Sequence, residues 1–209
     1  MSVVVSKFGG TSMGDAECML RSADVSVLKN SSVVVVSATS GTTNDLLKLG
    51  ELSESGKKEE SEILIKKIQD KHLKIAENLK ADQKTIFELQ TLLSEMDSIA
   101  KGIYLLRDCS AKAKDVLVSL GERLSSVLFT VALQIKSKKK VELFDVRKVL
   151  KTDETFGKAK PLTEKIIELC RKEMSACLNG STVYVTQGFI GQTLQGATTT
   201  LGRGGSDYS

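Results

Sequence analysis

Residues 32–44 read SVVVVSATSGTTN, and this stretch decides the fold. Its four consecutive valines form a run that is apolar on both faces, which is typical of a strand buried inside a parallel sheet. A polar turn, TSGTTND, follows the valines and leads into a helical pattern near residues 44–54. Buried strands that alternate with helices build a parallel sheet covered on both faces, so the stretch predicts an α/β fold.

The same alternation continues on both sides of this stretch. We predict further strands at residues 2–8, 141–146 and 182–191, and further helices at residues 15–29, 110–135 and 162–178. The first strand is expected to be buried and to end in a turn at Gly9 and Gly10. Pro161 is expected to open the last helix, as proline does at a first turn, and Asn179 with the glycine after it to end that helix. For residues 147–160 we predict an irregular loop.

Residues 57–107 interrupt this alternation. They contain two long amphipathic patterns with apolar residues at helical spacing, separated by a bend at Ala81 and Asp82. We therefore predict a helical hairpin that packs on the sheet as an excursion within one domain. The single histidine of the chain, His72, lies on the first of these helices, where we expect it to be solvated.

Composition and charge narrow the class of protein. The 209 residues are 41% hydrophobic and 27% charged, which suits one domain with a sizeable core. The net charge of +4 suits anionic small substrates. With 4% aromatic residues and no tryptophan, the chain lacks the basic and aromatic surface of a nucleic-acid-binding protein.

Cysteine usage and the N-terminal sequence indicate a cytoplasmic protein. The four cysteines form no CxxC pair and only one histidine is present, so we expect no protein-held metal and four free thiols in a reducing compartment. The start, MSVVVSKFGG, lacks the basic region and the longer apolar stretch of a signal peptide. We also expect no apolar run that is long enough to span a bilayer.

The loop SKFGGTS at residues 6–12 is a candidate phosphate site. It follows a strand at its carboxyl end, where open α/β sheets bind ligands, and it combines glycine N–H groups, hydroxyls and Lys7. It matches neither common nucleotide motif, and a tight turn with a surface lysine is the alternative. Lys7 favours the site, because it interrupts an apolar strand near the end expected to be buried, and a buried lysine needs an anion.

Two further polar stretches have weaker signals. SATSGTTN at residues 37–44 predicts a second polar loop on the same edge of the sheet, with an ordinary helix cap as the alternative. In SLGERLSS, residues 119–126, Gly121 stands inside an apolar helix, where glycine costs about 1 kcal/mol relative to alanine. This glycine indicates close approach by a backbone or a ligand. Glu122 beside Arg123 is equally compatible with an exposed ion pair.

TLGRGGSD at residues 200–207 is the strongest local signal. Arg203 carries a planar guanidinium that suits a carboxylate or a phosphate. Ser206 and Asp207 would cap a following helix, whose N–H groups favour an anion, and Asp207 can also accept from an ammonium group. The loop therefore offers groups for both ends of an amino acid, and a flexible tail is the alternative.

Six stretches together resemble the aspartokinases of the amino-acid kinase family. They occur in the family's order along the whole chain: KFGGTS, VVVVSATSGTTNDLL, SLGERLS, DVRKVLKTDETFGKAKP, VTQGFIG and TTTLGRGGSDYS. The resemblance implies a three-layer α/β/α sandwich with a mostly parallel sheet. It also implies ATP-dependent phosphorylation of the L-aspartate side chain to 4-phospho-L-aspartate, the first step toward lysine, threonine and methionine and, in bacteria, diaminopimelate.

The resemblance also implies residue roles and a cofactor, ATP with Mg²⁺. The phosphate loop would be Lys7, Phe8, Gly9 and Gly10; the aspartate-binding groups would be Thr43, Glu122, Phe189, Arg203, Ser206 and Asp207; and the catalytic pair would be Lys7 and Asp207. An aspartate carboxylate has a pKa near 3.9 and is already an ionised nucleophile at neutral pH, so no general base is required. Positioning and charge neutralisation by lysine, glycine N–H groups and Mg²⁺ then supply the catalysis.

Members of this family continue beyond the region that this chain matches. Their further segments hold the adenine and ribose contacts and, in most members, paired regulatory domains. We therefore expect residues 1–209 to be the N-terminal part of a catalytic domain, incomplete at the C-terminus and without regulatory domains, from an enzyme that is a homo-oligomer at full length. Two alternatives are a relative that acts on glutamate, acetylglutamate or a nucleoside monophosphate, and a catalytically incomplete binding or partner module that retains the aspartate site.

Overall fold

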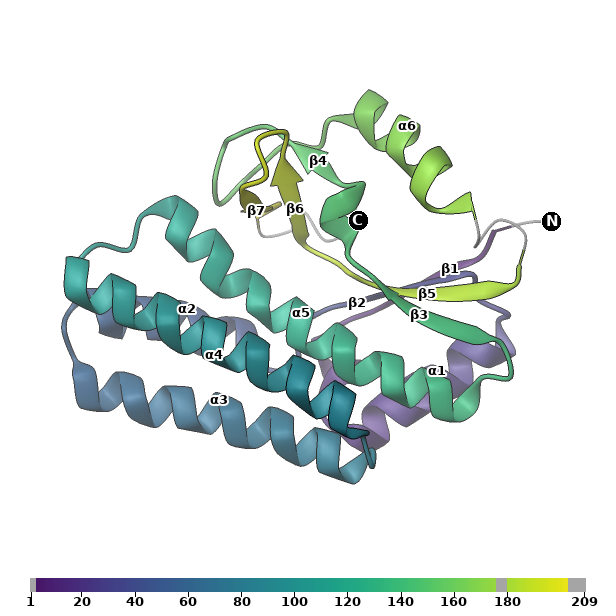
Figure 1. Cartoon of the computed structure of the whole chain (residues 1–209), viewed down its shortest axis with the longest axis horizontal. Helices are drawn as coiled ribbons and strands as arrows, with labels where there is room; N and C mark the ends of the chain where they lie inside the picture. The colour runs from purple at the N-terminus through teal and green to yellow at the C-terminus, as the bar shows by residue number, and fades with distance from the viewer. Residues whose placement is uncertain (1–2, 176–179, 203–209) are drawn as a thin grey trace.

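Four parallel strands form the centre of the computed structural model, which describes residues 3–175 and 180–202. Their order is β1-β2-β5-β3, and every neighbouring pair is parallel. A second sheet of three short strands, in the order β4-β6-β7, lies beside the first (Figure 1). The predicted α/β fold with a mostly parallel sheet is confirmed.

The elements follow one another from the N-terminus in alternating blocks of strands and helices. In chain order they are β1 Val5–Phe8, η1 Gly10–Met13, α1 Ala16–Leu28, β2 Val33–Val36, α2 Thr42–Glu54, α3 Lys58–Asn78, α4 Gln83–Leu106, α5 Ala111–Lys136, β3 Lys140–Phe144, η2 Val146–Lys148, β4 Lys151–Thr152, α6 Thr163–Glu173, β5 Thr182–Gln187, β6 Ile190–Thr193 and β7 Thr198–Thr200.

The two faces of the main sheet belong to two apolar clusters. Val34 and Val36 of β2 point into the larger cluster, with α1 and the helices from α2 to α5. Val33 and Val35 point to the opposite face, into a smaller cluster with α6 and the second sheet. Figure 1 shows the same layering, with α1 to α5 on one side of the sheet and α6 on the other. Both faces of β2 are buried, which explains its unbroken run of valines.

Helix α5 is the central helix of the larger layer. By length and composition it is apolar enough to cross a membrane, with a mean hydropathy of 1.6 in its most apolar window. The expectation that no apolar run reaches that length was therefore wrong. However, 83% of the window is buried inside the protein, where α5 packs against α1, α4, β3 and β5. This burial is typical of the core helix of a globular domain.

Strand β1 lies at the edge of the main sheet and is more exposed than the sequence predicted. Among the described residues it pairs only with β2, and its residues alternate between exposed and half-buried. Val5 is 58% exposed and Lys7 is exposed as well. The expectation of a buried strand was wrong because a local apolar run does not reveal whether a strand occupies the centre or the edge of a sheet.

The predicted strand at 182–191 is two strands in different sheets. β5 ends at Gln187 and β6 begins at Ile190, and between them Phe189 has a φ angle of +66°. This left-handed residue turns the chain out of the main sheet and into the second one. The supposed irregular loop at 147–160 contains η2 and β4, and Thr198–Thr200, where no strand was predicted, forms β7. The errors at β4, β6 and β7 concern the small second sheet, whose short strands KT, IGQT and TTT contain almost no apolar residues and so leave no apolar run.

Helix α6 is shorter than predicted. It spans Thr163–Glu173 with Leu162 as its N-cap, so Pro161 stands before the cap and forms an isolated bridge with Thr152. Asn179, the expected end of the helix, lies outside the described residues.

Candidate functional site

A cavity of about 410 Å³ opens at the carboxyl edge of the main sheet. The loop after β1 and the segment from the end of β2 into α2 form one side of it. The lining residues are Gly10 from the first and Ser37, Ala38, Thr39, Gly41, Thr43 and Asn44 from the second. Helix α5 forms the floor, and Phe189, Thr200 and Gly202 close the side that faces the second sheet. The position agrees with the general rule that open α/β sheets bind ligands beyond the carboxyl ends of their strands.

Glu122 is the most unusual group of this cavity. Its side chain is 3% exposed, and its Oε1 atom accepts a hydrogen bond of 3.3 Å from the backbone N–H of Ala38. Its Oε2 atom is buried and has no hydrogen-bond partner among the residues that the structure describes. Burial raises the pKa of Glu122 to about 8, because a carboxylate loses its hydration there. A cationic group entering the cavity would satisfy this acid.

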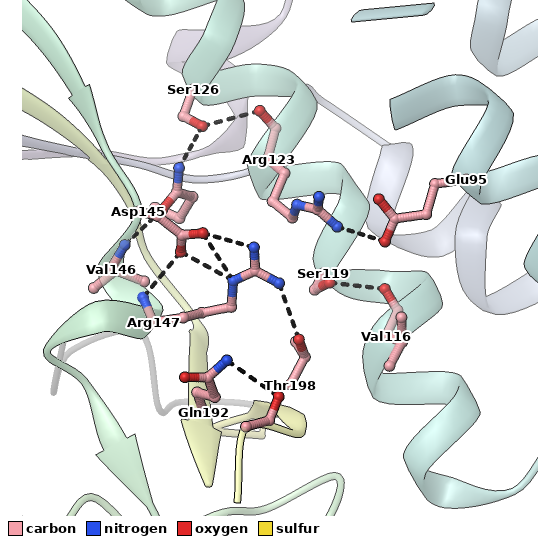
Figure 2. A network of polar contacts seen from close by, with 12 residues as sticks. Glu95, Val116, Ser119, Arg123, Ser126, Asp145, Val146, Arg147, Gln192 and Thr198 are labelled. Atoms are coloured by element: carbon pink, nitrogen blue, oxygen red, sulfur yellow. Dashed lines mark hydrogen bonds and ion pairs between the residues drawn. The ribbon is translucent and has the colours of Figure 1, made fainter. Parts of the chain in front are cut away.

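The expected alternative for Glu122, an exposed ion pair with Arg123, is wrong. Arg123 turns away from the cavity and binds Glu95 of α4, with an Nη1–Oε1 distance of 2.7 Å (Figure 2). Gly121 explains why the glutamate can approach the loop after β2. A Cβ atom on Gly121 would lie 2.9 Å from the Cβ atom of Ala38, so only glycine allows this close packing.

Sequence reasoning missed a second acid of the cavity, Asp115 in the first turns of α5. Its side chain is 2% exposed and accepts three hydrogen bonds: from the Gly157 N–H at 2.9 Å, the Thr200 N–H at 2.9 Å and the Thr200 hydroxyl at 2.7 Å. Burial raises the pKa of Asp115, and these bonds offset part of the rise. The missed signal was spacing, because Asp115 stands seven residues before Glu122 and hence on the same helix face.

The expected phosphate loop reaches the cavity only in part. Gly10 lines it, and a Cβ atom there would lie 3.2 Å from the Ala38 carbonyl oxygen, so a side chain would press on the loop after β2. Phe8 packs on Phe129, with ring centroids 5.9 Å apart. Gly9 and Lys7 are exposed and do not line the cavity. The premise that Lys7 is a buried cation was therefore wrong.

The remaining predicted site residues divide into two groups. Thr43, at the start of α2, and Phe189, after β5, are half-buried and both line the cavity. Arg203, Ser206 and Asp207 lie outside the described residues. The last described residues before them, Leu201 and Gly202, bring the chain to the cavity wall.

His72 is buried, contrary to the expectation that it is solvated. Its side chain is 0% exposed, and its two ring nitrogens contact the Ile68 carbonyl oxygen at 2.7 Å and the Thr39 hydroxyl at 3.2 Å. Burial lowers the pKa of His72 to about 4, so the imidazole is neutral at physiological pH. Thr39 belongs to the cavity lining, and His72 therefore stands directly behind the site.

A polar network holds the second sheet against the main one. Figure 2 shows the guanidinium of Arg147 between Asp145 and Thr198. Its Nη2 atom lies 2.6 Å from Oδ2 of Asp145, and its Nη1 atom donates to the Thr198 hydroxyl at 3.0 Å. Burial alone would raise the pKa of Asp145, but the hydrogen bonds and charge of Arg147 outweigh it and lower the pKa below its usual value. Gln187 at the end of β5 joins η2 to α5, because its amide oxygen accepts from the Val146 N–H and its amide nitrogen donates to the Ser126 hydroxyl.

The described residues offer no preformed metal site. Within residues 3–175 and 180–202, no three histidine, cysteine, aspartate or glutamate side chains gather to hold an ion. Asp115, the acid with the most partners in the cavity, is already occupied by three hydrogen bonds.

The fold and the cavity together define an α/β domain with a pocket, lined by two buried acids, at the carboxyl edge of a parallel sheet. The family comparison is more specific. Residues 2–209 match the model of the amino acid kinase family, and the chain belongs to this family.

Its relatives are aspartokinases. The chain is 42% identical over 209 residues to the lysine-sensitive aspartokinase 3 of Escherichia coli, an alignment that covers 99% of this chain and 45% of that enzyme. It is 33% identical to the chloroplastic aspartokinase 1 of Arabidopsis thaliana, covering 98% of this chain and 36% of that one. The chain therefore spans less than half the length of the curated relatives it matches.

Solved structures agree with this assignment. E. coli aspartokinase III, in complex with aspartate and ADP, superimposes with a TM-score of 0.90 at 39% identity, over 99% of this chain and 45% of that one. An aspartate kinase from Clostridium acetobutylicum has a TM-score of 0.74 at 22% identity, which supports the fold alone.

Proposed function

We propose that this chain forms the aspartate-binding part of an ATP-dependent aspartate kinase, which converts L-aspartate to 4-phospho-L-aspartate. The observation that carries the proposal is the buried, unsatisfied Oε2 atom of Glu122 in a cavity of about 410 Å³ at the carboxyl edge of the sheet. The likeness to an aspartokinase that was crystallised with aspartate and ADP supports the choice of substrate.

In this proposal Glu122 receives the α-ammonium group of aspartate. The pKa of Glu122, about 8, keeps this acid largely protonated without a ligand, and an incoming ammonium group would favour its ionised form. Thr43 and Phe189 would contact the rest of the substrate, and Arg203, Ser206 and Asp207 would complete the site. The side-chain carboxylate is then the nucleophile, and it is ionised without help from a base.

The ATP phosphates would lie at the loop that follows β1, near Gly10. Glycine there lets the backbone come close to the Ala38 carbonyl, and Lys7 at the end of β1 would supply positive charge. Mg²⁺ bound with ATP would neutralise charge on the phosphates. The described side chains show no cluster that fits a protein-held ion, so we assign the metal to the nucleotide and no step to a protein ligand.

Trapping of the acyl phosphate tests the reaction. The native full-length enzyme that contains residues 1–209 is incubated with ATP, Mg²⁺ and hydroxylamine, with either L-aspartate or L-glutamate, and the hydroxamate is measured. Formation of the hydroxamate with aspartate but not glutamate is the expected result, and preference for glutamate would assign the chain to another branch of the family. Calorimetry with aspartate alone measures substrate binding separately from phosphoryl transfer. Aspartate binding without turnover would favour the alternative of a catalytically incomplete binding module, and absence of binding would contradict the aspartate site itself.

We also propose that the full-length enzyme is a cytoplasmic homo-oligomer that uses neither nucleic acid nor membranes. The free thiols of Cys18, Cys109 and Cys170 support a reducing compartment. Fractionation of the source cells, followed by light scattering on the native enzyme, tests both parts.

A further inference from the structure

The helical hairpin formed by α3 and α4 reaches the candidate site through hydrogen bonds. His72 on α3 contacts Thr39, which stands in the loop between β2 and α2, at 3.2 Å. Thr39 in turn contacts the hydroxyl of Thr42, the first residue of α2, at 2.6 Å. All three side chains are at most 1% exposed. This is a buried polar connection between an excursion of the chain and a cavity-lining loop.

The donor and the acceptor of each bond in this series of hydrogen bonds can be assigned from the two ends of the series. A carbonyl oxygen only accepts, so the contact of 2.7 Å between His72 Nδ1 and the Ile68 carbonyl places the ring hydrogen on Nδ1. Nε2 of the neutral ring then accepts, and the Thr39 hydroxyl donates to it. With its hydrogen used, Thr39 must accept from the Thr42 hydroxyl.

At the other end of the series, Lys71 can only donate, because an ammonium group has no acceptor. The ammonium group of Lys71 donates to the Thr42 hydroxyl oxygen at 3.3 Å and to the Ser40 carbonyl oxygen at 2.5 Å. Hydrogen-bond donation therefore runs from Lys71 through Thr42 and Thr39 to His72, and every donor in the series meets an acceptor. Lys67 adds an ion pair of 2.8 Å to Asp45 of α2, so the hairpin contacts the loop and the start of α2 at several adjacent points.

We infer that His72 is a positioning residue that holds residues 37–44, which comprise the loop after β2 and the first residues of α2, in their ligand-binding shape. This segment carries Thr39 and Thr43 of the cavity wall and the Ala38 N–H that binds Glu122. The hairpin thus belongs to the substrate site, although it contributes no side chain that lines the cavity. This inference rests on the proposed function for the identity of the ligand, and its geometric part stands on the contacts alone.

Two amide variants of His72 separate the two ring nitrogens. In His72→Asn the amide stands near the former Nδ1, so the bond to Ile68 can persist while the contact to Thr39 is lost. In His72→Gln the amide reaches the former Nε2 position, where its oxygen can accept from Thr39. When Thr39 loses its acceptor, its buried hydroxyl hydrogen has no partner, and the equilibrium constant for opening of the loop should rise about tenfold. This factor sets the size of the expected effect.

The experiment compares these variants in the 209-residue chain by NMR amide exchange at Thr42 and Asp45, and by calorimetry with L-aspartate. We expect exchange at Thr42 to become about tenfold faster in His72→Asn, with aspartate affinity about tenfold lower, and His72→Gln to restore both to within about threefold. Thr39→Val removes the same bond from the loop side and must reproduce the His72→Asn result. It also serves as the test if His72→Asn does not fold.

A matched control distinguishes positioning from general loss of stability. Leu93→Ala removes buried apolar volume from α4, where Leu93 is 3% exposed, and its side chain takes no part in the hydrogen-bond chain. It should leave aspartate affinity within about twofold of wild type. Equal weakening by Leu93→Ala, or unchanged Thr42 exchange in both His72→Asn and Thr39→Val, overturns the inference.

The single histidine provides an independent readout. A long-range ¹H–¹⁵N spectrum contains signals from one imidazole only, and we expect the Nδ1–H tautomer with a hydrogen-bonded Nε2. The Nε2 signal should shift in Thr39→Val, and a signal that does not respond overturns the assigned direction. If wild-type protein fails to bind aspartate, the proposed function fails, while the exchange and tautomer results still decide the role of His72.

Discussion

Two buried titratable side chains, Glu122 and His72, give the region of the cavity opposite responses to pH. Folding removes water from both, and removal of water always favours the neutral form. For the acid this raises the pKa to about 8, and for the base it lowers the pKa to about 4. At neutral pH both groups are therefore largely uncharged, and the cavity is ready for a ligand that brings its own charges.

Glu122 should destabilise the ligand-free protein as the pH rises. Between its ordinary pKa of 4.5 and its folded value of about 8, the folded state binds more protons than the unfolded state. The contribution of Glu122 to the free energy of unfolding is therefore fully present below pH 4.5, and up to about 5 kcal/mol of it is lost as the pH rises to 8. Glu122→Gln keeps the shape without the titration, so urea unfolding at pH 5 and pH 8 should show a smaller decrease in the variant. Equal decreases in both proteins would contradict a raised pKa.

His72 should have the opposite effect at lower pH. The unfolded state binds more protons between pH 4 and 6.5, because the folded pKa lies near 4 and the ordinary value is 6.5. The contribution is complete above pH 6.5, and up to about 3 kcal/mol is lost as the pH falls to 4. His72→Gln does not titrate, and the difference in unfolding free energy between variant and wild type should change with pH only in this window. A constant difference would mean that His72 titrates normally.

At the scale of elements, α5 connects the core to the site. One face of this helix packs beneath the main sheet, and the face with Asp115 and Glu122 forms the cavity floor. Gly121 lets the loop after β2 come down onto the helix. Glycine lowers the intrinsic stability of the helix relative to alanine. The close packing against Ala38 must therefore stabilise the protein by more than this lost helix propensity.

A pair of glycine substitutions tests this close contact. Gly121→Ala would place a methyl group 2.9 Å from the Ala38 Cβ atom, and we expect a loss of about 1–3 kcal/mol from overpacking. Gly102 in α4 has no atom within 4 Å of such a methyl group, so Gly102→Ala should stabilise by about 0.5–1 kcal/mol through helix propensity. Thermal unfolding of both variants provides the comparison. A stabilised Gly121→Ala protein would show that the loop yields easily.

The sequence predicted the elements of the main sheet because its strands lie in largely apolar runs and its covering helices are amphipathic. The valines of β2 and the amphipathic helices needed no long-range information. The exposure of Lys7 depends on strand order, and the burial of His72 depends on which face of α3 meets the loop. Both are properties of tertiary packing. Phe189 turns the chain with a positive φ angle that a phenylalanine does not signal, so the second sheet was missed.

At the scale of the whole molecule, the candidate site lies between two sheets. The main sheet carries the loops with Gly10 and Thr39, and the second sheet brings Thr200 and Gly202 to the cavity. Arg147 joins the two, because it follows β3 of the first sheet and donates to Thr198 in β7 of the second. The relative position of the cavity walls therefore depends on side chains that do not touch the ligand space.

Arg147→Met should loosen the second sheet without unfolding the first. The variant loses the bond to Thr198 and leaves Asp145, whose side chain is 36% exposed, without its cation. We expect amides of β6 and β7 to exchange about tenfold faster while those of β2 and β5 keep their wild-type rates. Aspartate affinity should fall because one wall of the site becomes mobile. Arg171→Met, on the exposed surface of α6, changes the net charge equally and should alter neither quantity. Uniform acceleration across both sheets would mean that they unfold as one unit and that Arg147 supports the whole domain.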